Sequence, residues 1–161
     1  MENFMKFLVF SLLIFVSFGV CAEEAFPKGC KAMPITGGTL MLPEGTPALI
    51  VIHNLSEMDL WVTHPISDSN GASAGWSTRL QADRWSAFAQ GDKAFELSCI
   101  ESKPGHEQQV PCSKVLAACQ WAGIKTPDKQ NAPFWAGENL PLKELLSHVE
   151  KRGFKLSASS K

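Results

Sequence analysis

The stretch Pro47–His53, PALIVIH, carries the strongest fold signal in this 161-residue sequence. It is an unbroken, β-branched apolar run of strand length. A turn, Pro43–Gly45, precedes it, and Asn54–Glu57 ends it. A short apolar run bounded by turn residues is typical of a strand in the core of a domain. We therefore expect Pro47–His53 to be the central core strand of the fold.

Shorter segments on either side show the alternation of half-buried strands. In Met58–His64, Met58, Leu60 and Val62 face one way, and in Lys93–Glu101 every second residue is apolar. Further strands are expected at Gly38–Leu42, Trp76–Leu80 and Arg84–Ala89, and Val115–Trp121 fits either a strand or a short helix. Short strands separated by frequent turns predict a mostly β protein, an antiparallel β-sandwich of Ig-like or cupredoxin-like type.

The C-terminal region instead shows the periodicity of a helix, expected at about 140–152. Asn139 can cap it, with Pro141 in its first turn, and Gly153 can end it. One apolar stripe runs along this segment: Leu142, Leu145, Leu146 and Val149. We expect the stripe to pack on the domain, with a partner-binding helix as the alternative, and residues 157–161 to fray.

The first 22 residues have the pattern of a secretory signal peptide. An uncharged run, Phe7–Val20, is too short to cross a bilayer as a helix, and Val20-Cys21-Ala22 offers small residues for cleavage. An uncleaved anchor and a lipid on Cys21 are alternatives, the second disfavoured by Val20. Cleavage after Ala22 leaves 139 of the 161 residues, which suits one domain over 23–156 with no transmembrane segment.

Four cysteines remain after that cleavage, an even number that in an exported chain predicts two disulfides. Cys99 and Cys112 flank a Lys-Pro-Gly turn, so a hairpin centred near Gly105 would bring them opposite each other. Pairing of Cys99 with Cys119 fits about as well, and in either case Cys30 would take the remaining partner. The sequence leaves these pairings open.

Charge and motifs exclude several functions. With 15 Lys+Arg against 16 Asp+Glu, the net charge of −1 does not suit a nucleic-acid-binding protein or a polybasic membrane binder. The sequence has no G-x-S-x-G motif and no phosphate-binding glycine loop, and its acidic residues lie at turns and on exposed faces. We therefore expect a protein that is not an enzyme and uses no cofactor.

Three histidines, His53, His64 and His106, are candidates for a metal site because a secreted β-sandwich raises the question of copper. A blue-copper centre needs a cysteine thiolate, two histidines and usually a methionine. No methionine follows His106, and Cys99 is expected in a disulfide. A looser copper site that includes Met58 remains as a hypothesis.

Two polar segments, the loop Ser67–Gly75 and the hairpin tip Ser102–Gln108, are the candidate binding loops, because a sandwich holds the ends of such loops in place. The five tryptophans are expected to pack in the core, with a cluster for ligand stacking as the alternative. The expected partner is another protein of the envelope or of a host.

Four stretches together resemble the EnhB-like enhanced-entry proteins, which are small exported proteins of intracellular bacterial pathogens. They are Ile52–Pro65, Ala72–Trp85, Phe95–Cys112 and Phe134–Phe154. The resemblance implies a periplasmic or secreted protein that aids host-cell entry or intracellular survival, and it supplies no catalytic residues. Two other functions are kept as alternatives: inhibition of an envelope or host hydrolase, such as a lysozyme or lytic transglycosylase, and periplasmic copper binding.

Overall fold

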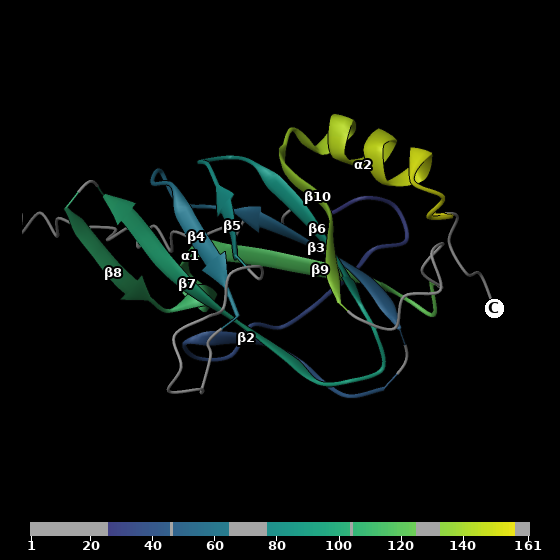
Figure 1. The fold of residues 1–161 in the computed structure, drawn as a ribbon, viewed down its shortest axis with the longest axis horizontal. Coiled ribbons are helices and arrows are strands. Elements are labelled where there is room, and N and C mark those ends of the chain that lie inside the picture. Colours follow the sequence, from purple (N-terminus) through teal and green to yellow (C-terminus); the bar gives the residue numbers. More distant parts are fainter. Residues whose placement is uncertain (1–25, 46, 65–76, 104, 125–132, 157–161) are drawn as a thin grey trace, which may run out of the picture.

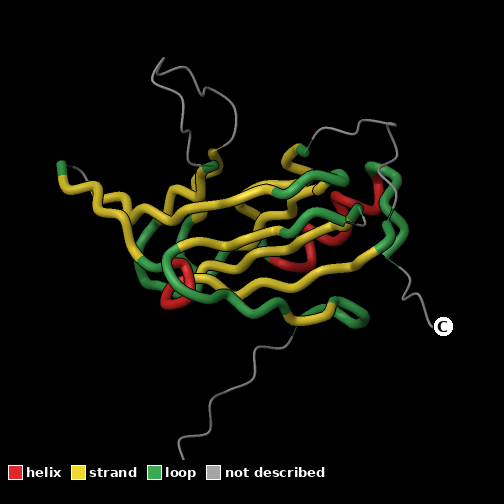
Figure 2. The backbone as a smooth tube through the Cα atoms, turned by 90° about the horizontal axis from the view of Figure 1, so that it is seen from below, coloured by secondary structure: helices red, strands yellow, loops and turns green. Residues whose placement is uncertain are grey.

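A computed structural model describes residues 26–45, 47–64, 77–103, 105–124 and 133–156. The expected signal peptide, the loop Ser67–Gly75 and the tail at 157–161 lie outside the described residues. Two antiparallel sheets pack face to face in the described part of the chain (Figures 1 and 2). The first, called the β3 sheet, has the strand order β1 (Lys31–Ala32), β9 (Leu116–Ala122), β3 (Ala48–Asn54), β6 (Trp85–Gln90) and β10 (Phe134–Leu140).

The second sheet, called the β7 sheet, is built around its longest strand. Its order is β2 (Thr39–Leu42), β7 (Phe95–Lys103), β4 (Leu60–Thr63) and β5 (Ser77–Leu80), and β8 (His106–Val110) also pairs with β7. All strand pairs in both sheets are antiparallel. The predicted antiparallel β-sandwich with a C-terminal helix is therefore confirmed, whereas its Ig-like or cupredoxin-like type stays a prediction.

Strand β3 lies at the centre, as its apolar run predicts. It pairs with β9 along one edge and with β6 along the other, and all seven of its residues are buried. Alternate side chains of a strand point to opposite faces of the sheet. Ile50 and Ile52 belong to the core between the sheets, while Leu49 and Val51 belong to a second core beneath the C-terminal helix.

That helix, α2 (Leu142–Lys151), covers the second core, as Figure 1 shows. Leu145 and Val149 are fully buried, and the half-buried Leu142 and Leu146 pack against the same cluster. The apolar stripe thus packs on the domain, as predicted. Because β3 has a core on each face, the domain has three layers: the β7 sheet, the β3 sheet and α2.

The helix ends as the sequence predicts. Gly153 has a φ of +93°, and its N–H donates to the carbonyl of Glu150 at 2.9 Å, while the N–H of Phe154 donates to that of Val149 at 3.1 Å. These two bonds form a Schellman motif, in which a glycine in the left-handed region satisfies the last carbonyls of a helix. The motif directs Phe154 back into the second core, where it is buried.

The start of the helix differs from the prediction, because Asn139 does not cap it. The N-cap position is Pro141, and Asn139 lies in β10 with a φ of +53°. The Asn139 Oδ1 atom accepts the N–H of Gln81 at 2.9 Å, and its own N–H donates to Ser86 Oγ at 2.9 Å. The amide that could cap α2 is therefore used to fasten the end of β10 to the turn after β5.

Two other elements depart from the simple strand pattern. The segment with two readings, Val115–Trp121, is a strand from Leu116 onward, in β9. Its first residue, Val115, ends a one-turn helix, α1 (Cys112–Val115), that leads into the strand. Strand β10 is not anticipated by the sequence. Its pairing with β6 shifts register on both sides of Gly137, and such shifts break the alternation by which strands are recognised.

Within the described residues, no helix combines the length and hydropathy that crossing a bilayer requires.

The contact between α2 and β10 predicts that Gly137→Ala destabilises the protein. A Cβ atom at position 137 would lie 2.5 Å from Leu145 Cδ1, and overpacking of this kind costs about 1–3 kcal/mol. Gly38→Ala is the matched control, because a Cβ at position 38 meets no atom within 4 Å. Urea unfolding of both variants measures the difference, and equal stability of the two would contradict the close packing of α2.

Candidate functional site

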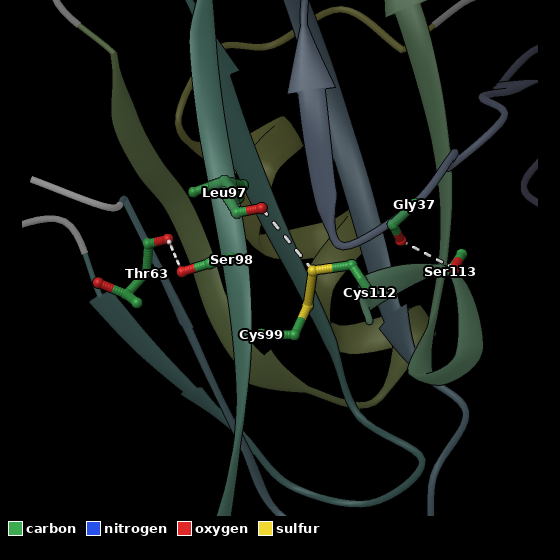
Figure 3. Close-up of a disulfide and its surroundings, with 7 residues drawn as sticks. All are labelled: Gly37, Thr63, Leu97, Ser98, Cys99, Cys112 and Ser113. Atoms are coloured by element: carbon green, nitrogen blue, oxygen red, sulfur yellow. Dashed lines mark hydrogen bonds between the residues drawn. A yellow bond between two sulfur atoms is a disulfide. The ribbon is translucent and has the colours of Figure 1, made fainter. Parts of the chain in front are cut away.

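The four cysteines form two disulfides, which settles the pairing that the sequence leaves open. Cys30 pairs with Cys119 and ties the N-terminal segment to β9. Cys99 pairs with Cys112 and joins β7 to the first residue of α1 (Figure 3). Both members of the second pair are fully buried. With their sulfurs bonded to each other, none of the four thiols is a metal ligand.

His53, at the buried end of β3, lies against an aromatic ring. Its imidazole stacks on Trp85 with ring centroids 4.0 Å apart, and Nε2 lies 3.1 Å from Asp83 Oδ1. The side chain of His53 is 11% exposed and that of Asp83 is 95% exposed. In a hydrolytic triad the carboxylate is buried and the histidine faces the substrate. The burial here is reversed, so this pair has the arrangement of a packed core histidine.

His64 follows β4 at the other end of the sandwich. Its Nδ1 lies 2.7 Å from the carbonyl of Glu96, and its ring stacks on Phe95 at 4.2 Å. A carbonyl oxygen only accepts hydrogen bonds, so Nδ1 carries a proton and donates it. This leaves Nε2 as the acceptor atom of the neutral ring.

His106 is exposed at the start of β8, opposite Lys103. His64 contacts Glu96 of β7, and His106 lies opposite Lys103 of the same strand. Glu96 and Lys103 are seven positions apart, or roughly 23 Å at the usual rise of a strand. His53 belongs to the other sheet. The structure therefore does not bring His53, His64 and His106 together, and its described residues hold no cluster of three or more metal-ligating side chains.

The feature that stands out is the hairpin formed by the end of β7 and by β8, called here the arm and comprising Glu101–Gln109. It extends beyond the other strands in both views (Figures 1 and 2). The first four residues of β8 are exposed and the fifth is half-buried. Cys99 and Val110, which face each other at its base, are the last apolar pair of the ladder. Beyond them comes the half-buried Ile100, opposite Gln109, and the residues of the arm itself are polar on both faces.

The base of the arm is held firmly. The disulfide between Cys99 and Cys112 closes it, and Cys112 N–H donates to the carbonyl of Gly38 at 3.0 Å. Ser113 Oγ donates to the carbonyl of Gly37 at 2.9 Å, as Figure 3 shows. These bonds fix α1 against the turn that precedes β2, so the arm leaves the sandwich in a defined direction.

The sequence points to this region as the tip of a hairpin centred near Gly105, and the structure has that hairpin. The strands reach further than expected, because all described residues of Ser102–Gln108 except the turn at Gly105 belong to β7 and β8. The signal was present in the two cysteines that flank the Lys-Pro-Gly turn, but the polar run His106–Gln109 hides the strand. The tryptophans show no stacking platform: of the four that the structure describes, none is exposed.

The described surface includes two shallow grooves. One, of about 280 Å³, is lined mostly by residues with apolar side chains and lies between the N-terminal segment and β9, with the exposed Leu55 beside it. The other, of about 600 Å³, runs along α2 and is lined by Leu140, Lys143, Glu144, Ser147, His148 and Lys151. Ionisable and hydroxyl side chains therefore gather along this second groove.

Comparison with known proteins gives no further guide: no protein-family model, curated protein sequence or solved structure matches this chain. Its function is therefore argued from the arm and from the scaffold that holds it.

The two disulfides should contribute unequally to stability. They close segments of 89 and 13 residues, and the chain-entropy relation gives about 4.5 kcal/mol for the longer and about 3 kcal/mol for the shorter. The double variant Cys30→Ala/Cys119→Ala should therefore unfold at lower urea concentration than Cys99→Ala/Cys112→Ala. The reverse order would contradict the expectation that the length of the closed segment decides the two contributions.

Proposed function

We propose that this protein is exported and non-catalytic, and that it binds another protein of the bacterial envelope or of a host through the arm. The observation that carries the proposal is a polar, exposed two-stranded ribbon with a cross-linked base. An isolated two-stranded hairpin is at best marginally stable in water, and ordering each residue costs about 1–2 kcal/mol. Since the arm buries little apolar surface, packing does not account for it, and a binding role does.

Export is supported by the two disulfides, which form and persist in oxidising compartments. The expected signal peptide agrees with this. The resemblance to the enhanced-entry proteins extends the proposal to a role in host-cell entry or intracellular survival.

A binding role is favoured over catalysis by the placement of the three candidate histidines. His53 is packed against Trp85 behind an exposed carboxylate, and His64 and His106 lie at opposite ends of β7. General acid–base or nucleophilic catalysis needs such groups within hydrogen-bond reach of one another and open to a substrate.

A second candidate function is inhibition of an envelope or host hydrolase, such as a lysozyme or lytic transglycosylase. The arm also carries this proposal, because its end presents Lys103, His106 and Glu107 on a hairpin narrow enough to enter a cleft. A rigid inhibitory segment binds well because little conformational freedom is lost on association. The two proposals share a surface and differ in the partner.

Site-specific cross-linking in the protein's own cells tests the arm. A photoreactive benzophenone residue replaces His106 at the end of the arm, and in the matched control it replaces Glu150, which is exposed on α2. The expected result is a discrete conjugate with a different protein from position 106 and none from position 150. No conjugate with another protein from position 106, or the same conjugates from both positions, would overturn the proposal.

The inhibitor proposal makes a narrower prediction. Lys103→Ala/His106→Ala/Glu107→Ala should lose inhibition of the purified hydrolase identified by the cross-link while keeping the urea midpoint of the parent within error. The three removed side chains are exposed and lie outside both cores, so the fold does not depend on them. Unchanged inhibition would exclude the arm as the inhibitory element.

A further inference from the structure

Strand β8 is the longest edge strand with an unshifted ladder among the described strands. Native edge strands are commonly shortened, bulged, covered, or given charged side chains, especially Lys, or Pro. Strand β1 has only two residues, β2 and β5 have four each, and the pairing of β10 is broken by register shifts. β8 has five residues in an unshifted ladder, HEQQV, with no Lys and no Pro.

Hydrogen bonding shows which backbone groups of β8 point outward. β4 and β8 both pair with residues 99–101 of β7, so they lie on opposite edges of it. The N–H of Ser102 donates to the carbonyl of Asp59, which precedes β4, at 2.9 Å. Ser102 therefore points its backbone groups away from β8, and its partner Glu107 forms a non-hydrogen-bonded pair with it.

In an antiparallel ladder the two kinds of pair alternate. Since Glu107 directs its N–H and C=O away from β7, Gln109 does the same, while His106, Gln108 and Val110 are bonded to β7. The exposed edge thus offers two donor–acceptor positions, Glu107 and Gln109. No described strand lies against them.

We infer that this edge pairs with β8 of a second copy of the chain, antiparallel and about a two-fold axis, with Glu107 opposite the partner's Gln109. The inference rests on the proposed function only in using the arm as the contact surface.

A two-fold pairing of outward positions allows three registers. In the first register, Glu107 lies opposite the partner's Glu107, which brings two carboxylates together. Like charges directly opposite each other destabilise a sheet.

Gln109 opposite its own copy is also unfavourable, because it brings Glu107 against the partner's Pro111, which has no N–H to donate. The third register uses every outward group. It forms two hydrogen-bonded pairs, places each Glu107 carboxylate beside a Gln109 side-chain amide that can donate to it, and sets the two copies of Gln108 opposite each other at the axis. A self-complementary surface of this kind is what a two-fold dimer requires.

The ladder is short, so the dimer should be weak. Stable interfaces bury about 1,200–2,000 Å², and a five-residue strand with four exposed residues per copy places this contact at the low end. We expect sedimentation equilibrium of the mature chain, begun at residue 23, to show monomer at micromolar concentration. The apparent mass should rise towards twice the monomer value as the concentration approaches millimolar.

Two variants at one position separate backbone pairing from side-chain effects. Gln109→Pro removes an outward N–H, which an edge strand tolerates, and should stay monomeric at every concentration. Gln109→Ala keeps that N–H and should still dimerise. A monomeric parent, or a Gln109→Pro variant that dimerises as the parent does, would overturn the inference.

Cysteine cross-linking tests the register without depending on the proline variant. In the inferred register the two copies of residue 108 form a non-hydrogen-bonded pair about 4.5 Å apart between Cα atoms, within disulfide range. The copies of residue 107, and likewise of residue 109, are diagonal neighbours about 7–8 Å apart. Gln108→Cys should therefore form a covalent dimer much faster than Glu107→Cys or Gln109→Cys, and equal rates would contradict the register.

The dimer inference and the proposed function can be overturned independently of each other, because they are tested by different measurements. Loss of the symmetric dimer leaves an arm that still cross-links to a different protein from position 106. A dimer with no conjugate to a different protein would leave self-association and remove the proposed function.

Discussion

The burial of β3 on both of its faces is the constraint on which the rest of the structure depends. Its backbone is bonded on both edges, and its side chains supply both cores, Ile50 to one and Leu49 to the other. A strand in this position must be apolar at consecutive residues, which is what PALIVIH provides. Its two faces then require two covers, the β7 sheet on one side and α2 on the other. The close approach of α2 to β10 at Gly137 and the return of Phe154 into the second core follow from the second requirement.

The arm contributes no side chain to either hydrophobic core. The inter-sheet core ends along β7 at Cys99, yet β7 continues to Lys103 and returns as β8. A disulfide and the hydrogen bonds of α1 to the Gly37–Gly38 turn hold this extension where apolar packing stops. The scaffold is therefore stabilised by the burial of apolar side chains. The arm is stabilised by the hydrogen bonds between β7 and β8 and by the disulfide at its base.

The parts of the fold that the sequence predicts are those with one dominant local signal. Pro47–His53, the apolar stripe of α2 and the cap at Gly153 are of this kind. Strand β10 was missed because its register shifts remove the alternation, and Asn139 was misassigned because its amide is used by Gln81 in a distant part of the chain. The disulfide pairing stayed open because cysteine spacing fits two neighbours of Cys99 equally well. The histidines lie near strand ends in the sequence, but only the strand order shows that His64 and His106 are at opposite ends of β7.

Native-state hydrogen exchange of the mature chain, followed residue by residue by NMR at low concentration, tests most directly whether a doubly buried strand carries an exposed arm. The account predicts that the amides of Leu49–Ile52 exchange only through global unfolding, so that they report the full free energy of unfolding. Within β8, the amides of Glu107 and Gln109 should exchange fastest, and that of Gln108 should be slower because it is bonded to β7. If the Glu107 and Gln109 amides were as protected as those of β3, or if β3 exchanged as readily as β8, the division into scaffold and arm would be wrong.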